Sequence, residues 1–224
     1  LVGSEMCIRD STDLTPLDSW TNGQLNPAYY QDYATYFVKW VQAFNAEGID
    51  IYAVTPQNEP LNRGNSASLY MSWEEQRDFV KTALGPKFKT AGLATKIYAY
   101  DHNYDYSDIA TEKNYPGKMY EDAAASQYLA GAAYHNYGGN REELLNIHKA
   151  YPEKELLFTE TSIGTWNSGR DLSKRLLEDM KEVALGTINN WCRGVIVWNL
   201  MLDNDRAPNL SLIHISEPTR QEAI

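Results

Sequence analysis

Two glutamates lie in a sequence context that is common for catalytic carboxylates. Glu59 and Glu160 each follow a short apolar segment directly, and Glu59 lies between Asn58 and Pro60. Two carboxyl groups in one pocket, one protonated and one ionised, can cleave a glycosidic bond. Either residue alone would be interpreted as an ordinary surface glutamate, because glutamate is mostly exposed. Their shared context predicts a catalytic pair, and we assign the proton of the pair to Glu59.

The segments around this pair alternate between strand and helix patterns. Apolar stripes behind helix caps such as Asn26-Pro27 and the Ser72/Glu75 capping box predict helices. These helices are expected at residues 27–47, 72–85, 116–128, 141–150 and 173–187. Short β-branched or apolar runs predict strands at residues 49–55, 96–100, 130–134, 155–159 and 194–198. Such alternation indicates an α/β fold with parallel strands.

The residues after each predicted strand distinguish two α/β architectures. Polar or aromatic clusters follow all of the strands, namely Asn58-Glu59, Asp101-His102-Asn103, His135-Asn136-Tyr137, Glu160-Thr161 and Trp198-Asn199. A (β/α)₈ barrel brings all such ends into one mouth, whereas a doubly wound sheet concentrates its ligand at one switch point. No glycine-rich phosphate loop follows any of these strands. The pattern therefore favours part of a (β/α)₈ barrel.

Barrel geometry places the two glutamates at a workable distance. Three βα units separate them, so their strands should lie three apart. Strand spacing and barrel diameter then leave roughly 6 Å between the carboxyl groups. This spacing allows glycosidase chemistry without deciding between retention and inversion.

Composition excludes several classes of partner. The 224 residues carry a net charge of −10, which repels nucleic acid and anionic lipid. No apolar run is long enough to span a membrane, and no secretion signal is visible. Sixteen tyrosines and six tryptophans suit a site that stacks sugar rings, although most of these rings are expected in the core.

The two ends of the chain do not continue the pattern between them. Residues 1–11 and 211–224 have neither helical nor strand periodicity and resemble translated sequencing-adapter sequence. We expect them to be artefactual or disordered, which leaves 12–210 as a partial barrel domain.

Three motifs together resemble glycoside hydrolase family 30. They are AVTPQNEP at 53–60, LLFTETSIG at 156–164 and VIVWNLMLDNDRAPN at 195–209. The resemblance implies a retaining mechanism on a (β/α)₈ barrel that carries a small β-sandwich. It makes Glu59 the acid/base after the fourth strand and Glu160 the nucleophile after the seventh. The five predicted strands would then be strands 4 to 8, and the chain alone is expected to be poorly stable and inactive.

The resemblance also implies several substrate contacts. Asn58 would bind the sugar 2-hydroxyl, Tyr137 would lie near the nucleophile, and Trp198 would form the floor of the sugar site. His102 and His135 would be sugar-hydroxyl ligands or supports for the glutamates, and Asp101 and Asn103 are weaker candidates of the same kind. Trp166 would form an outer subsite or a lid over the core, and Asn199 is a further expected substrate-binding residue. The histidines lack metal-ligand spacing, so neither a metal nor another cofactor is expected.

The first functional hypothesis is an endo-β-1,6-glucanase, which would take a β-glucan or another β-glucoside as substrate. A glucosylceramidase or β-glucosidase is the alternative of the same chemistry. A non-catalytic sugar-binding module or an inactive fragment is the alternative from a different class. We expect a monomer that is secreted, periplasmic or on the cell surface, because polysaccharide hydrolases of this kind usually work outside the cytoplasm.

Overall fold

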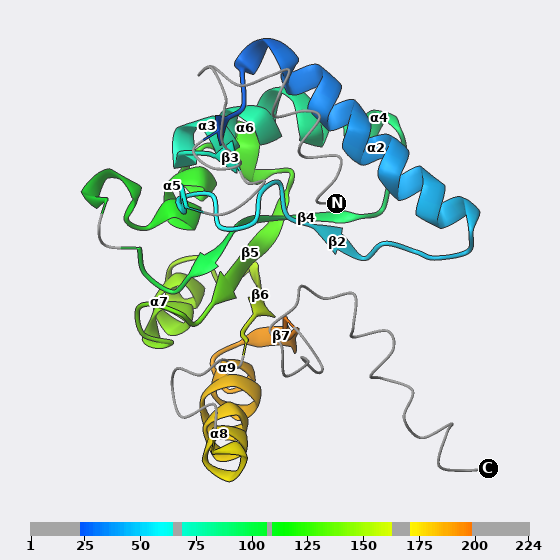
Figure 1. Cartoon of the computed structure of the whole chain (residues 1–224). Helices are drawn as coiled ribbons and strands as arrows, with labels where there is room; N and C mark the ends of the chain where they lie inside the picture. Colours follow the sequence, from blue (N-terminus) through cyan, green and yellow to red (C-terminus); the bar gives the residue numbers. More distant parts are fainter. Residues whose placement is uncertain (1–22, 65–68, 107–108, 163–170, 199–224) are drawn as a thin grey trace, which may run out of the picture.

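The computed structural model describes residues 23–64, 69–106, 109–162 and 171–198. Its centre is a parallel five-stranded sheet with the order β2-β4-β5-β6-β7, and a second pair joins β1 to β3 (Figure 1). The strands are β1 (Gly23–Gln24), β2 (Ala53–Val54), β3 (Leu69–Tyr70), β4 (Lys96–Asn103), β5 (Leu129–His135), β6 (Glu155–Glu160) and β7 (Cys192–Val195). This half-barrel confirms the predicted α/β class and places β2 and β6 three strands apart.

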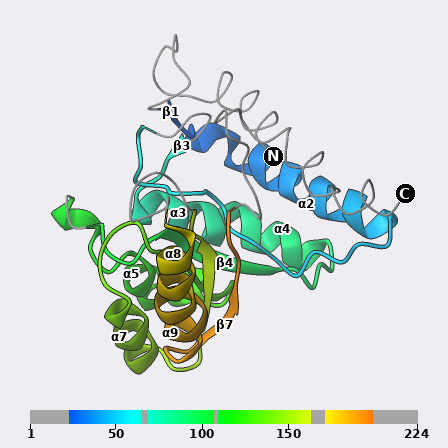
Figure 2. The same ribbon diagram turned by 60° about the horizontal axis from the view of Figure 1, so that its bottom comes forward.

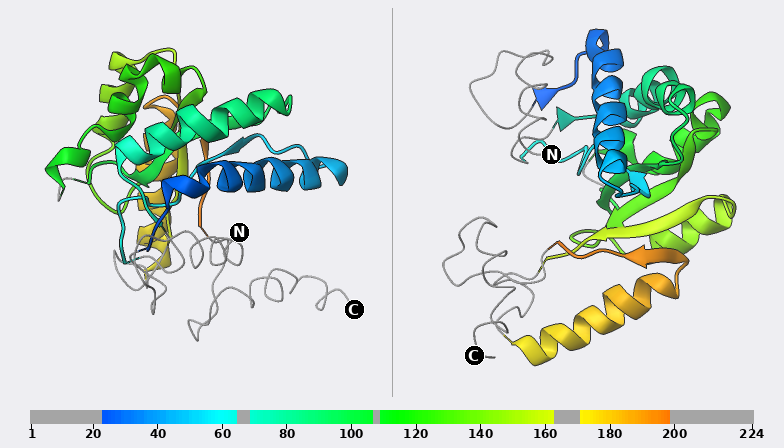
Figure 3. Two further views of the ribbon diagram at one scale, coloured as in Figure 1. Left: turned by 90° about the horizontal axis from the view of Figure 1, so that it is seen from above. Right: turned by 90° about the vertical axis from the view of Figure 1, so that its right-hand side faces the viewer.

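Helices precede the first strand of the five-stranded sheet and connect each of its strands to the next. They are η1 (Pro27–Tyr29), α2 (Tyr30–Ala46), α3 (Trp73–Phe79), η2 (Val80–Leu84), α4 (Gly85–Thr90), η3 (Ala110–Glu112), α5 (Tyr115–Glu121), α6 (Ala123–Ser126), α7 (Glu142–Ala150), α8 (Leu172–Glu178), η4 (Asp179–Ala184) and α9 (Leu185–Ile188). In the turned views α2 and α4 lie towards one end of the sheet and α8 and α9 towards the other (Figure 2, Figure 3).

The first predicted helix is confirmed together with its caps. The Asn26 side chain accepts a hydrogen bond from Ala28, Pro27 begins η1, and Gly48 follows α2 with a φ of +78°. Tyr33 and Phe37 on the apolar stripe pack on Phe79 of α3. Buried aromatic pairs of this kind hold α2 against α3.

The second helix does not end at Gly85-Pro86, contrary to the sequence prediction. The capping box of Ser72 and Glu75 is present, but α3 continues through the π-helical turn η2 into α4. The wider turn accommodates the missing N–H of Pro86. Gly85 is required by packing, because a Cβ there would lie 2.2 Å from Cγ of Tyr128. Gly85-Pro86 thus lies inside a longer helix, where that helix packs closely on Tyr128.

Two other predicted helices differ in detail. The helix expected at 116–128 is divided into α5 and α6 at Asp122, whose carboxylate accepts hydrogen bonds from Ala124 and Ala125 and so starts a new helix. The helix expected at 173–187 contains the π-helical turn η4. Helix α7 agrees with the predicted range 141–150, and the Asn140 side chain accepts from the Glu142 N–H.

The end strands of the sheet are shorter than the sequence predicts. The predicted strand 49–55 forms only β2, and Ile49 and Tyr52 are about half exposed. The predicted strand 194–198 is displaced to β7 at Cys192–Val195. Among the described residues, β2 and β7 each pair with one neighbouring strand only. An apolar sequence typical of a buried strand therefore does not form a long row of backbone hydrogen bonds at these two positions.

An open hollow of about 380 Å³ lies beside the sheet. Tyr52, Tyr98 and Ile196 line it, and Asp101 and Thr159 contribute its polar part. Within the described residues, no helix is long and apolar enough to cross a membrane. The predicted tails 1–11 and 211–224 lie outside the described residues, and the domain limits drawn around them stay predictions.

Candidate active site

Glu59 is placed by the loop that follows β2. Its backbone has a φ of +45°, and its N–H donates to the carbonyl oxygen of Asp101 at 2.9 Å. The side chain is buried, and its Oε2 accepts from the Asn62 amide at 2.7 Å. A non-glycine residue in left-handed conformation is costly unless its surroundings fix it, and such residues concentrate at functional sites.

Asp101 enters the site through an irregularity in β4. The register between β4 and β5 shifts between Tyr100 and His102, and both Tyr100 and Asp101 have positive φ, at 74° and 64°. The buried Asp101 carboxylate accepts from the Thr55 hydroxyl at 2.6 Å and from the Thr159 hydroxyl at 2.6 Å. A β-bulge re-aims a side chain in this way, so the bulge turns Asp101 into the barrel.

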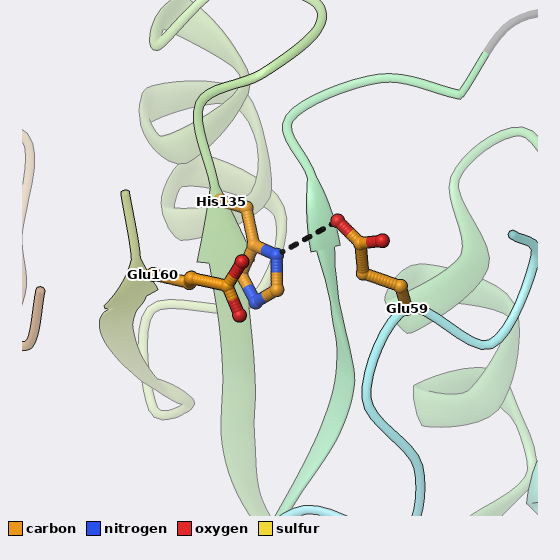
Figure 4. Close-up of side chains that lie close together, drawn as sticks. All are labelled: Glu59, His135 and Glu160. Atoms are coloured by element: carbon orange, nitrogen blue, oxygen red, sulfur yellow. Dashed lines mark hydrogen bonds and ion pairs between the residues drawn. The ribbon is translucent and has the colours of Figure 1, made fainter. Parts of the chain in front are cut away.

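His135, the last residue of β5, lies between two carboxylates. Its Nδ1 lies 3.3 Å from Oε1 of Glu59, and its Nε2 lies 3.0 Å from Oδ1 of Asp101. The imidazole side chain is only 1% exposed. Figure 4 shows the ring between Glu59, which comes from the loop after β2, and Glu160 at the end of β6. Both ring nitrogens thus face carboxylate oxygens.

Glu160 faces the same space from β6. The Tyr137 hydroxyl lies 3.0 Å from its Oε1 and 3.1 Å from Oγ of Ser162. One atom each from Glu59, His135 and Glu160 lie within 4.8 Å of one another. The two glutamates predicted as a pair are therefore brought together at the carboxyl ends of the strands.

The contacts of the two glutamates do not favour the predicted proton on Glu59. Burial raises the pKa of Glu59, but hydrogen bonds from His135 and Asn62 outweigh it and lower that pKa to about 2. For Glu160, burial raises the pKa above its usual value against the lowering effects of His135 and Tyr137. Glu59 is thus the more acidic carboxyl. The prediction considered only the two glutamates and omitted the cation between them.

That cation is the His135 imidazolium. Burial lowers the pKa of His135, but the hydrogen bonds to Asp101 and Glu59 prevail and raise it to about 9. Burial also raises the pKa of Asp101, and contacts with His135 and the two threonine hydroxyls leave it lower than usual. Near neutral pH the arrangement is therefore carboxylate, imidazolium, carboxylate.

The spacing of Glu59, His135 and Glu160 would also permit a divalent ion. A histidine ligand must be neutral with a free lone pair, whereas both nitrogens of His135 face carboxylates as donors. A metal would have to displace this proton, so the donor set fits acid–base chemistry better than metal binding.

The other predicted site residues differ in burial and in contacts. Asn58 is exposed beside Glu59. His102 is buried, and its Nδ1 accepts from the Asn103 N–H, which places the ring proton on Nε2. Burial lowers the pKa of His102 to about 4, so this histidine is neutral. Trp198 is 54% exposed, and its backbone N–H donates to the carbonyl oxygen of Thr161 at 2.8 Å. The predicted residues Trp166 and Asn199 lie outside the described residues.

Sequence reasoning missed the small polar residues that orient the carboxylates. Thr55 and Thr159 bind Asp101, Asn62 binds Glu59, and Ser162 contacts Tyr137. The two threonines were detectable as hydroxyl residues at the ends of otherwise apolar runs, IDIYAVT and LLFT. No spacing rule would have indicated Asn62, which approaches Glu59 through a loop.

Comparisons with known proteins agree on one family. The family model described as "Glycosyl hydrolase family 30 TIM-barrel domain" matches residues 11–219. An endo-1,6-β-D-glucanase from Trichoderma harzianum is 35% identical over 85% of this chain and 38% of its own length. The lysosomal acid glucosylceramidase of Mus musculus is 25% identical over 84% of this chain and 38% of its own length.

A solved structure gives a nearer comparison. The endo-β1,6-glucanase BT3312 is 89% identical, with a TM-score of 0.84, over 87% of this chain and 43% of the BT3312 chain. The chain thus spans less than half the length of these relatives.

Proposed function

Because this chain belongs to glycosyl hydrolase family 30, we propose that Glu59 and Glu160 are the catalytic pair of a retaining endo-β-1,6-glucanase. The observation that carries the proposal is the approach of the two carboxylates, with an oxygen of each inside the 4.8 Å group that includes His135. Retaining enzymes hold their carboxyl groups about 5–5.5 Å apart, whereas inverting enzymes need about 6.5–9.5 Å to admit a water. The close approach supports retention.

In this proposal Glu160 attacks the anomeric carbon while Glu59 delivers a proton to the leaving oxygen. The Tyr137 hydroxyl orients Glu160 and stabilises its ionised form. Esterification then removes the negative charge of Glu160, and Glu59 accepts a proton from the water that hydrolyses the ester. The site needs no cofactor for either step.

Asn58 and Trp198 are proposed to bind the sugar directly. Asn58 is exposed next to the acid/base, where an amide can reach the 2-hydroxyl of the sugar. Trp198 is half exposed beyond β7, which leaves indole surface free for stacking. The buried His135 contacts Glu59 and is itself held by Asp101, and neither these two residues nor the buried His102 is proposed to contact the sugar directly.

The substrate class is proposed from the relatives. The 89% identical structure and the Trichoderma protein are both described as endo-1,6-β-glucanases, which favours a β-1,6-glucan. A glucosylceramidase is the second candidate, supported by the more distant murine relative. A polymeric glucan cannot enter a cell intact, so we propose that the complete protein acts outside the cytoplasm, as a monomer.

Hydrolysis by the complete polypeptide that contains this sequence tests the proposal. We expect release of β-1,6-linked oligosaccharides from β-1,6-glucan and little turnover of glucosylceramide or xylan. Turnover of the lipid alone would replace the glucanase with the second candidate.

Glu160→Gln should lower kcat by several orders of magnitude while the fold is retained, because an amide cannot form the covalent intermediate. A 2-fluoro sugar inhibitor should leave its adduct on Glu160, as detected by peptide mass spectrometry. Glu142→Gln is the matched control, since Glu142 is exposed on α7 away from the site. If Glu160→Gln retained full activity, a different nucleophile would be required.

A further inference from the structure

The hydrogen bonds around His135 define where the proton of the active site can reside. Oε2 of Glu59 accepts from the Asn62 amide, whose own oxygen accepts from the Gly64 N–H and so fixes the amide orientation. The opposite oxygen, Oε1, faces Nδ1 of His135. A proton shared by these residues therefore lies between Oε1 of Glu59 and Nδ1 of His135.

The far side of His135 is fixed by Asp101. Each oxygen of this buried carboxylate accepts from a threonine hydroxyl, and Oδ1 also faces Nε2 of His135 at 3.0 Å. An ionised Asp101 accepts from all three donors, so Nε2 must carry its own hydrogen. Asp101 thus holds the ring in one orientation, and Nδ1 is left as the nitrogen that can exchange a proton with Glu59.

We propose that Asp101 and His135 are positioning residues that store the catalytic proton, which His135 shares with Glu59 until the glycosidic oxygen takes it. The proposal rests on the function proposed above for Glu59. Nδ1 of His135 passes its proton to Oε1 of Glu59, and as the bond to the leaving oxygen breaks, that oxygen takes this same proton from Glu59. Glu59 is then ionised and the ring of His135 is neutral. When water attacks the ester, its proton returns through Glu59 to Nδ1, so the proton count is unchanged over a cycle.

This arrangement contains as many protons as the usual glycosidase site. A protonated glutamic acid beside a neutral histidine and an ionised glutamate beside an imidazolium differ only by the position of one hydrogen. The groups that face His135 are Glu59 after β2, Asp101 and His102 on β4, Tyr137 after β5 and Glu160 on β6. Three of the five are carboxyl groups and His102 is neutral, so the local charge favours the imidazolium.

The first test observes the proton without turnover, in the complete polypeptide labelled with ¹⁵N-histidine. We expect the ¹⁵N shifts of His135 to show both nitrogens protonated near pH 7.5 in the wild type. Asp101→Asn should make the ring neutral at the same pH, because the carboxylate that favours the charge is lost. The signals are assigned by their absence from His135→Gln. A neutral His135 in the wild type near pH 7.5 would overturn the proposal whether or not the protein cleaves glucan.

The second test compares leaving groups on β-gentiobiosides. A phenyl leaving group needs the proton, whereas 2,4-dinitrophenolate departs without one. His135→Gln should lower kcat/KM on the phenyl substrate by about 100-fold or more, and by less than about 10-fold on the dinitrophenyl substrate. The basic limb of the phenyl pH profile should move to lower pH, since the proton then resides on a carboxyl group alone.

His148→Gln is the matched control, because His148 stacks on Trp191 away from the site. Equal losses on both substrates would indicate a structural role and contradict the proposal. Circular dichroism checks that the variants fold. If His135→Gln does not fold, Asp101→Asn is used instead for the comparison of the two leaving groups. If the wild type cleaves neither gentiobioside, the glucanase assignment fails, while the ¹⁵N result still decides the position of the proton.

Discussion

At the scale of single residues, the two catalytic candidates differ in what surrounds them. Glu59 faces an imidazolium and an amide, whereas Glu160 faces a neutral phenol at 3.0 Å. The sequence was sufficient to pair Glu59 with Glu160, because both follow apolar strands three units apart. It could not locate the proton, because the contacts of His135 with Glu59 and Asp101 join residues from three separate strands or loops.

Tyr137→Phe should weaken the nucleophile. Removing the hydroxyl removes a hydrogen bond that lowers the pKa of Glu160, so that pKa should rise further. We expect kcat/KM to fall roughly 10- to 100-fold, the usual worth of a hydrogen bond to a charged group. The acidic limb of the pH profile should move to higher pH, because Glu160 must be ionised to attack. Tyr29→Phe, at an exposed tyrosine on η1, is the control and should change neither kcat/KM nor the acidic limb. If the acidic limb did not move in Tyr137→Phe, the assigned contact with Glu160 would be refuted.

At the scale of elements, sequence patterns located the helices and strands but not their irregularities. The caps at Asn26 and at Ser72/Glu75 are present as predicted. The bulge at Tyr100 and Asp101 was not predictable, because neither residue is a glycine and left-handed backbone in such residues depends on tertiary contacts. The π-helical turns were also missed, since the helical stripe continues through them.

Gly85→Ala should destabilise the protein even though alanine favours helices. The added methyl group would lie 2.2 Å from the Tyr128 ring, so α4 or the ring must shift. We expect the free energy of unfolding to fall by about 1–3 kcal/mol, as measured by urea denaturation. In a Tyr128→Gly background, which also removes the Tyr128 Cβ at 2.7 Å, the same change should be neutral or stabilising by up to about 1 kcal/mol. Lys89→Ala, at an exposed position on α4, is the control, and equal effects in both backgrounds would exclude a clash.

At the scale of the whole molecule, the buried charges make stability depend on pH. The pKa of His135 is raised from 6.5 to about 9, so its contribution is complete below pH 6.5 and is lost as the pH rises through about 9. The pKa of Glu59 is lowered from 4.5 to about 2, so its contribution is complete above pH 4.5 and is lost as the pH falls through about 2. The site as a unit is most stabilising between these limits.

Denaturation of the complete polypeptide at several pH values measures this effect. We expect the free energy of unfolding to decline between pH 6.5 and about 9 by an amount on the order of 3 kcal/mol, and the decline to be reduced in His135→Gln. His148→Gln should retain the wild-type profile. A decline of equal size in His135→Gln would assign the titration to another group.

The 224-residue chain studied alone should associate with itself. Large apolar side chains are half exposed or more on both ends of the sheet and along α8 to α9, among them Tyr52, Leu177, Leu185, Ile196 and Trp198. Exposed apolar side chains in this number promote association. Light scattering coupled to size-exclusion chromatography should therefore show mass above that of one chain, with no glucan turnover. A monodisperse active monomer would contradict this expectation.

The Asp101 carboxylate has a consequence for how this site can be altered. Through Thr55, His135 and Thr159 it connects the segment after β2, the end of β5 and β6 to its own strand β4. Substituting any one of these residues leaves buried donors or acceptors without partners. Substitutions here should be strongly non-additive, so in a combinatorial library productive changes at these four positions should occur together.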